Sequence, residues 1–162
     1  MSSRWHPTRW LAVILGGQPW LPKFGRQIVA LDKFLRRLTR GRITLLTFAG
    51  LPELFLTVAG RKSGVPRTTP LLCVPHEGGW FVAGSNWGGP KPPMWVGNLR
   101  AADTAVVEFK GRDTTVNARE LTGAERDAAW SVMLQTWPNY AKYEQRTARV
   151  ISVFRLEPAG RA

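Results

Sequence analysis

Cations and hydroxyls gather in one short segment, residues 60–70, which reads Gly-Arg-Lys-Ser-Gly-Val-Pro-Arg-Thr-Thr-Pro. Gly60 and Gly64 permit positive φ and close backbone approach, so the segment is predicted to be a hairpin loop between two strands. Backbone amides, hydroxyls and cations of such a loop can bind a phosphate together, although the P-loop spacing before a helix is lacking. A solvated basic turn is the alternative. The polar side chains are Arg61, Lys62, Ser63, Arg67, Thr68 and Thr69.

A second segment, the glycine- and proline-rich loop 84–93, precedes an expected short helix over Met94–Arg100. Backbone amides at the start of that helix can face an anion or a polarised carbonyl. The side chains of Trp87, Met94 and Trp95 can stack on a flat ring. A rigid loop around a packed tryptophan is the alternative.

A third segment contains Tyr140 and Tyr143, the two tyrosines of the chain. Their spacing of three places them on one face of a helical turn. Phenol groups can hydrogen-bond a substrate carbonyl or deliver a proton. The alternative is a pair of packed aromatic rings with hydrated hydroxyls.

The supply of nucleophiles and metal ligands is small, with one cysteine and two histidines. Cys73 lies in an apolar run and is expected to pack within a strand. This composition excludes an internal disulfide and a cysteine-based zinc site, and it disfavours Ser-His-Asp chemistry. A site built from the three segments would therefore hold and orient a ligand without an evident nucleophile.

Net charge is the outlying property, at +12 from 23 Lys and Arg and 11 Asp and Glu. Residues 1–42 contain nine basic residues and one acid, Asp32, and so carry +8 of that charge. Such a balance attracts polyanions: nucleic acid, an anionic membrane or a phosphorylated ligand. Nucleic acid is disfavoured because no recognition helix or RNP-like strand is evident and the basic residues alternate with Trp and Leu.

The chain divides into a basic N-terminal arm, residues 1–42, and a body, residues 43–162. We expect residues 1–25 to be irregular and residues 26–40 to form an amphipathic helix. That helix either docks on the core or rests on anionic lipid, with Trp5, Trp10 and Trp20 as interfacial anchors. No run of 18 apolar residues or signal-peptide cleavage site is evident. We therefore expect a cytoplasmic protein, peripheral at the inner face of the cell membrane if the arm binds lipid.

The body has the short apolar runs of strands, separated by turn residues. A longer helix is expected to begin with the capping box Thr122-Gly123-Ala124-Glu125 and to end near Gln135. Many short strands with few helices predict a mainly β, α+β protein with an antiparallel barrel or split barrel. The expected strands are 43–48, 54–59, 70–74, 80–85, 105–109, 114–121 and 150–156.

Taken in order, the motifs resemble a known family. They are Leu56-Thr57-x-x-Gly60-Arg61-Lys62-Ser63-Gly64-x-Pro66-Arg67-x-x-Pro70-Leu71, then Gly84-Ser85-Asn86, Lys91, Pro93-Met94-Trp95 and Asn98-Leu99. Over residues 54–158 the chain resembles the deazaflavin-dependent nitroreductase family of actinobacteria. The resemblance implies a split β-barrel with an FMN-binding-like fold. It also implies binding of coenzyme F420, a reduced 8-hydroxy-5-deazaflavin, and hydride transfer to a quinone, a nitroaromatic or an enone.

The resemblance also implies cofactor contacts and catalytic candidates. The phosphate and ribityl part would be lined by Arg61, Lys62, Ser63, Arg67, Thr68, Thr69, Pro70, Leu71 and Leu72. The ring would be lined by Ala83, Gly84, Ser85, Asn86, Met94, Trp95, Val96, Gly97 and Asn98. Tyr140 would border cofactor and substrate, and Tyr143 would lie at the substrate mouth. Tyr140, Tyr143, Ser85 or water would supply the proton.

The chain departs from the family pattern at three places, which affects the acceptor range more than the cofactor. Residues 85–89 read Ser-Asn-Trp-Gly-Gly where relatives often have Ser-Lys-Gly-Gly, so that a cation is lost and an indole could enter the site. Leu72 and Val96 stand where many relatives have aromatics. Two other classes stay open: an FMN- or haem-binding split barrel, and a non-enzymatic basic module that binds membranes. A homodimer also stays open, since many split barrels pair.

Overall fold

The computed structural model describes residues 7–39 and 44–160. Six strands form a closed barrel in the order β1-β2-β3-β6-β5-β4, in which every neighbouring pair is antiparallel. This confirms the predicted mainly β barrel. The strands are β1 (Glu53–Ala59), β2 (Pro66–His76), β3 (Gly79–Ala83), β4 (Ala105–Phe109), β5 (Arg112–Glu120) and β6 (Val153–Pro158).

Alternation of side chains along the strands creates two hydrophobic cores. On β1, Leu54, Leu56 and Val58 point inward and are buried with Val107 and Phe154, among others, in the barrel interior. On β2, neighbouring residues separate: Leu71 packs on this interior core, whereas Leu72 packs on a second core outside the barrel. That division follows from the two-residue period of a strand.

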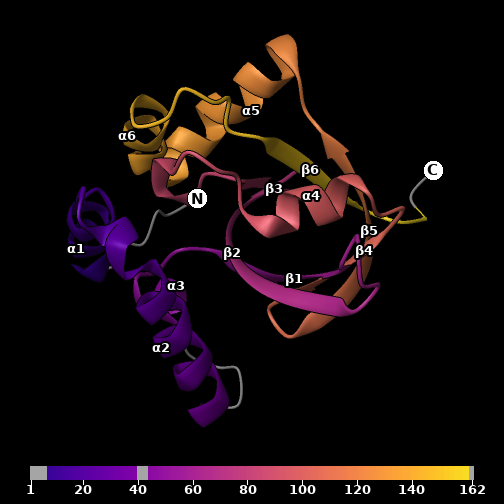
Figure 1. Cartoon of the computed structure of the whole chain (residues 1–162), viewed down its shortest axis with the longest axis horizontal. Helices are drawn as coiled ribbons and strands as arrows, with labels where there is room; N and C mark the ends of the chain where they lie inside the picture. The colour runs from indigo at the N-terminus through magenta and orange to yellow at the C-terminus, as the bar shows by residue number, and fades with distance from the viewer. Residues whose placement is uncertain (1–6, 40–43, 161–162) are drawn as a thin grey trace.

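Helices α4 (Met94–Arg100), α5 (Gly123–Thr136) and α6 (Asn139–Gln145) contribute to the two cores. Helix α4 adds Trp95, Val96 and Leu99 to the interior core. Helices α5 and α6 form the second core against the outer face of the barrel. Figure 1 shows α5 and α6 together on one side of the barrel and α4 across its front.

The predicted capping box at the start of α5 is wrong. Thr122 occupies the N-cap position, but its side chain makes no capping hydrogen bond. Gly123 has a left-handed φ of 55°, so the spacing from Thr122 to Glu125 is not that of a regular first turn. The Glu125 carboxylate instead accepts two 2.6 Å hydrogen bonds from Arg119 on β5.

The N-terminal region is more helical than expected. Residues 7–16 form α1 (Pro7–Gly16), and a 3-10 turn η1 (Leu21–Phe24) leads into α2 (Gly25–Leu38), so the prediction of irregular structure is wrong there. The predicted strand over 43–48 is also wrong from residue 45, where α3 (Leu45–Phe48) begins. The Thr44 hydroxyl caps this helix by accepting the Thr47 N–H at 3.1 Å.

Helix α1 docks on the body, whereas α2 extends away from it (Figure 1). Ala12 and Val13 pack on the outer core, and the Asn139 side chain donates to the Val13 carbonyl at 2.6 Å. On α2, buried Asp32 accepts the Leu45 N–H at 2.8 Å. None of the helices in the described ranges is long and apolar enough to cross a membrane. The predicted boundary at residue 42 lies outside the described residues.

Candidate active site

The predicted hairpin loop joins β1 to β2 and leans on α4. Gly60 donates its N–H to the Val65 carbonyl at 2.9 Å, and Gly64 takes a φ of 68° that glycine adopts without strain. The Arg61 N–H donates to the buried side chain of Asn98 at 3.2 Å. A Cβ on Gly97 would lie 2.0 Å from the Arg61 guanidinium. The structure thus brings Arg61 of the hairpin together with Gly97 and Asn98, which the sequence placed in another motif.

The hairpin cations are exposed and uncompensated. Arg61, Lys62 and Arg67 all face solvent. Within residues 7–39 and 44–160, no carboxylate forms an ion pair with any of them. Ser63 accepts the Val65 N–H at 3.3 Å, and Thr68 shares a 2.7 Å hydrogen bond with Thr57. Three unpaired cations on one turn create a positive potential suited to an anion.

Strand β2 runs from the cationic hairpin to the outer core, where buried aromatic residues lie. Thr68, Pro70 and Leu72 share its outer face by the two-residue period. Leu72 reaches the outer core, which also contains Ala83 and Tyr140. Five residue steps separate Arg67 from Leu72, which corresponds to roughly 17 Å along an extended strand. Thr68, Pro70 and Leu72 therefore form a track, called the β2 track, between the positive hairpin and Tyr140 of α6 (Asn139–Gln145).

The loop after β3 has an unusual backbone. Gly84 donates its N–H to the Ser152 carbonyl at 2.9 Å and lies so close to Val96 that a Cβ would meet that side chain at 2.5 Å. Asn86 and Trp87 both adopt left-handed conformations, with φ of 45° and 51°, in the 3-10 turn η2 (Asn86–Gly88). The Asn86 side chain donates to the Lys91 carbonyl at 3.0 Å. Ser85 thus lies at a bend between Gly84 and Asn86, both of which are fixed by hydrogen bonds.

Arg149, which was not among the predicted site residues, holds this loop through hydrogen bonds to its backbone. Its Nε donates to the Gly89 carbonyl at 3.1 Å, and its Nη2 donates to the carbonyls of Gly84 at 3.0 Å and Ser85 at 2.8 Å. Partial burial lowers the pKa of the guanidinium. Arg149 lies in an unremarkable polar stretch before β6, and no spacing rule links it to a loop 60 residues away. Only the fold reveals this contact.

The residues expected to stack on a ring have different surroundings. Trp95 is buried 5.8 Å from Phe154, and Val96 is fully buried, so both side chains belong to the interior core. The Trp87 ring packs on Gly25 at the start of α2. Met94 is 73% exposed and is the member of this group open to a ligand. Trp95 and Val96 can line a site only through their backbone.

The two tyrosines share one face of α6, as predicted, with ring centroids 6.1 Å apart. Both are buried, and Tyr140 also packs against Trp130 at 5.2 Å. The Tyr143 hydroxyl donates to the Gly16 carbonyl of α1 at 2.7 Å. Burial raises the pKa of Tyr143 to about 12 and raises that of Tyr140 further. Both phenols therefore stay protonated at neutral pH and can act as hydrogen-bond donors.

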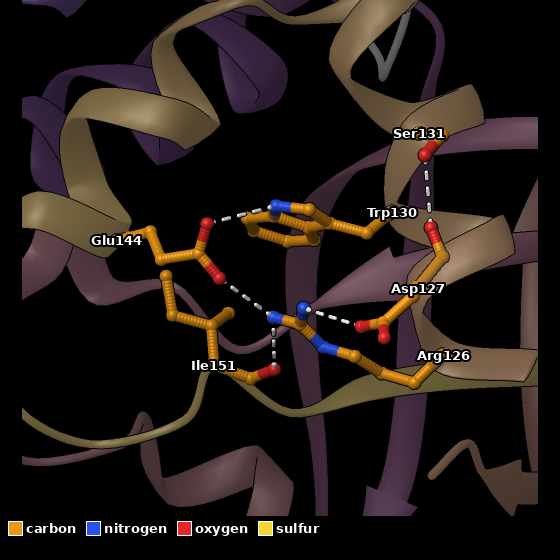
Figure 2. A network of polar contacts seen from close by, with 6 residues as sticks. All are labelled: Arg126, Asp127, Trp130, Ser131, Glu144 and Ile151. Carbon is orange, nitrogen blue, oxygen red and sulfur yellow. Dashed lines mark hydrogen bonds and ion pairs between the residues drawn. The ribbon is translucent and has the colours of Figure 1, made fainter. Parts of the chain in front are cut away.

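A polar network orients the tyrosine helix (Figure 2). Buried Arg126 on α5 donates to the Glu144 carboxylate at 3.2 Å and to the Ile151 carbonyl at 3.3 Å. Trp130 donates its indole N–H to the same carboxylate at 3.1 Å, while its ring lies 4.5 Å from the Arg126 guanidinium. Glu144 belongs to α6, so the network fixes α6 to α5 and to the segment that follows Arg149.

Two cavities lie away from the predicted site. One of about 280 Å³ lies between α5 and strands β3, β5 and β6, lined by Phe81 and Arg155 among others. The other, of about 580 Å³, lies at the start of β1 beside the β4–β5 turn, lined by Phe55 and Phe109. None of the predicted site residues lines either cavity. Those residues lie on the hairpin, β2, the loop after β3, α4 and α6 instead.

The barrel with its outer helices has the architecture of the split-barrel proteins. The solved structure of an F420-H2 dependent reductase (FDR-A) aligns with a TM-score of 0.61 and 36% identity over 65% of this chain and 94% of that one. A second structure, described as a domain-swapped dimer, aligns with a TM-score of 0.63 and 33% identity over 79% and 96%. A haem-binding protein from Mycobacterium smegmatis, 15% identical with a TM-score of 0.52, shares the fold alone.

The family model of the F420H(2)-dependent quinone reductases matches residues 31–158. An F420H(2)-dependent quinone reductase of Mycobacterium tuberculosis is 30% identical over 138 residues, which are 83% of this chain and 93% of the relative. The chain therefore belongs to the F420H(2)-dependent quinone reductase family. It is an F420-dependent oxidoreductase, which confirms the predicted enzyme class and cofactor.

Proposed function

We propose that this enzyme reduces quinones with F420H2, using the hairpin, the outer face of β2 and the loop after β3 as its site. The single observation that carries the location is the β2 track, which joins an uncompensated cationic turn to a buried aromatic cluster. A ligand with an anionic tail and a flat ring fits a site with those two ends. The quinone is inferred from the family, whose relatives are named for that acceptor.

The donor set of the chain fits the coenzyme. Arg61, Lys62 and Arg67, with Ser63 and Thr68, would hold the anionic tail. Pro70 and Leu72 would follow it along the outer face of β2, whereas Thr69 and Leu71, whose side chains alternate to the inner face, would contribute only their backbone. The ring would lie against Ala83, Gly84, Ser85, Asn86, Met94 and the backbone of Trp95, Val96, Gly97 and Asn98. When bound, the coenzyme supplies a hydride, so the chain needs only to bind, orient and hydrogen-bond the reactants.

Three hydroxyls are the candidates for stabilising negative charge on the acceptor oxygen and for delivering the proton. Ser85 stands at the bend of the loop and is half-buried. Tyr140 lies in the core at the end of the β2 track. The Tyr143 hydroxyl already donates a hydrogen bond to the Gly16 carbonyl, so it would have to give up that partner to bind a substrate. We therefore place Ser85 and Tyr140 before Tyr143 as donors.

The test is to titrate the purified full chain with F420, FMN and haem and then to follow oxidation of F420H2 by a soluble naphthoquinone. Micromolar binding of F420 alone, with turnover that requires the quinone, is expected. Turnover with nitroaromatic or enone acceptors but none with quinones would contradict the proposed acceptor class.

We also propose that the arm binds the surface of an anionic membrane, from which a lipid-soluble quinone could be taken. Leu31, Phe34 and Leu38 lie along one side of α2 and are 49%, 61% and 70% exposed. Trp10, Leu11, Ile14 and Leu15 of α1 and Trp20 and Phe24 of the connecting turn are also exposed. Such a contiguous exposed apolar surface marks an interaction site.

Charge favours lipid as the partner of this surface. Lys23, Arg26, Lys33 and Arg37 are exposed on the same segment, while its acid, Asp32, is buried. Basic residues near anionic headgroups contribute about 1 kcal/mol each, and the apolar side chains add burial in the interface. Chemistry of this kind suits a peripheral enzyme at the inner face of the cell membrane.

Vesicle sedimentation of the full chain tests this surface. The wild type should sediment with phosphatidylglycerol-containing vesicles and stay in solution with phosphatidylcholine alone. Phe34→Ser with Leu38→Ser should lose this binding, while Val106→Ser, at an exposed site on the barrel, should retain it. Equal sedimentation of all three proteins would refute the lipid role. A concentration-dependent dimer that the α2 variant abolishes, without vesicle binding, would assign the surface to a homodimer instead.

A further inference from the structure

The loop after β3 is held by a single guanidinium from a distant part of the chain. Arg149 donates to the carbonyls of Gly84, Ser85 and Gly89, so both ends of the loop converge on one side chain. No acid of residues 7–39 and 44–160 forms an ion pair with Arg149. Its contacts therefore serve the loop backbone and not a charge pair.

The loop requires such a tether because its backbone is not in a regular conformation. Asn86 and Trp87 both have positive φ, which side chains other than glycine rarely adopt without support. Two turn hydrogen bonds act inside the loop, from Gly88 to Ser85 at 2.9 Å and from Gly89 to Asn86 at 2.8 Å. The Ser85 carbonyl thus accepts hydrogen bonds from both the Gly88 N–H and Arg149. Arg149 therefore binds the backbone directly before Asn86 and Trp87, the two residues with positive φ.

The segment that carries Arg149 is itself anchored. The Ile151 carbonyl accepts from buried Arg126, which also binds Glu144 on α6 (Figure 2). On the other side of the loop, Gly88 lies so close to α6 that a Cβ would meet the Tyr143 carbonyl at 2.5 Å. The loop is therefore clamped between α6 and the segment before β6.

The orientation of the tethered carbonyls has a consequence for the amides of the loop. In a trans peptide the N–H points opposite to the C=O of the same unit, and the chain has no cis peptide among its described residues. Because the carbonyls of Gly84 and Ser85 point at Arg149, the N–H groups of Ser85 and Asn86 point away from it. Fixed amide donors of this kind polarise a carbonyl oxygen.

We propose that Arg149 is the positioning residue of this loop, and that it directs the Ser85 and Asn86 amides to bind a carbonyl oxygen of the deazaflavin. This inference rests on the proposed site. Arg149 acts through the backbone and touches neither reactant. Its guanidinium is suited to the task because Nε and Nη2 are separate donors held in one rigid plane and reach carbonyls at both ends of the loop, whereas the donors of a lysine share a single nitrogen.

The test compares the wild type, Arg149→Met and Arg149→Lys with the control Arg119→Met, which removes an exposed arginine paired with Glu125. Amide hydrogen exchange of the ligand-free full chain reports the loop, and fluorescence titration reports F420 binding. In both Arg149 variants the amides of Gly88 and Gly89 should exchange at least about tenfold faster, and the F420 Kd should rise about tenfold. The control should change neither by more than about twofold.

The outcomes separate the two proposals. Unchanged exchange at Gly88 and Gly89 in the Arg149 variants refutes the positioning role, whatever happens to turnover. Failure of the wild type to bind F420 refutes the proposed function, while the exchange data still decide the role of Arg149. If Arg149→Met has no cooperative unfolding transition, Arg149→Lys decides, because it keeps the charge and removes the three-point contact.

Discussion

The hairpin makes the sharpest prediction about the site. Lys62→Ala combined with Arg67→Ala removes two exposed cations without altering Gly60 and Gly64, whose conformations shape the turn. We assume that each cation makes one charge-assisted contact to the anionic tail. Because both cations are exposed, each contact contributes to the binding free energy of F420 at the lower end of the usual range. A combined loss of about 1.4 kcal/mol corresponds to a tenfold higher Kd for F420. We expect at least that increase.

The assay is fluorescence titration of F420 at two ionic strengths. Because exposed charges are screened by salt, the difference between the wild type and the double variant should shrink as salt rises. Lys110→Ala with Arg112→Ala is the matched control, since it removes the same charge from exposed positions at the β4–β5 turn. Equal Kd values for the wild type and the hairpin variant would refute the assignment of the anion site. An equal loss in both double variants would show that net charge alone, and not the hairpin, attracts the coenzyme.

Two further predictions concern the contacts that hold the site in place. Tyr143→Phe should lower the free energy of unfolding by about 1–2 kcal/mol, measured by urea denaturation, because the Gly16 carbonyl loses its donor; full stability with lost turnover would instead make the hydroxyl a reactant. Glu120, which accepts two 2.6 Å hydrogen bonds from Arg100 of α4, has a pKa lowered chiefly by that partner. A lowered pKa in the folded state adds stability above the ordinary value of 4.5, which is lost as the pH falls through the folded pKa. The stability difference between the wild type and Glu120→Gln should therefore be constant near neutral pH and shrink below about pH 4.5, and a difference that does not vary with pH would argue against the pair.

Local patterns predicted the barrel well because the burial of residues in a strand follows the alternation of neighbouring side chains. Alternating apolar residues and turn glycines placed β1 and β4 almost to the residue, and they placed the hairpin between β1 and β2. The pair Tyr140 and Tyr143 shares a helical face because spacing alone determines it. Residues 45–48 were misassigned because a run of four residues, three of them apolar, fits a strand and a single helical turn equally, and the cap from Thr44 decides between them.

The surroundings of the candidate site could not be predicted in the same way. Trp95 and Met94 are neighbours of similar apolar character, yet one is in the barrel core and the other is exposed, since only the placement of α4 on the barrel separates them. The helical character of residues 7–16 was also missed, because a segment of ten residues is too short to be helical by its own propensity and α1 depends on packing against the outer core and α6.

The amino-acid sequence alone determined the strands, the cationic hairpin, the spacing of the tyrosines and, through its ordered motifs, the family and its cofactor. These features depend on residues near one another in the chain. The tertiary structure alone decided that Arg61 meets Asn98, that the Tyr143 hydroxyl is donated to Gly16, and that Arg149 holds the carbonyls around Ser85. Each of those contacts joins segments 37 to 127 residues apart, and a hydrogen bond across such a distance depends on how the whole barrel closes and not on any local preference.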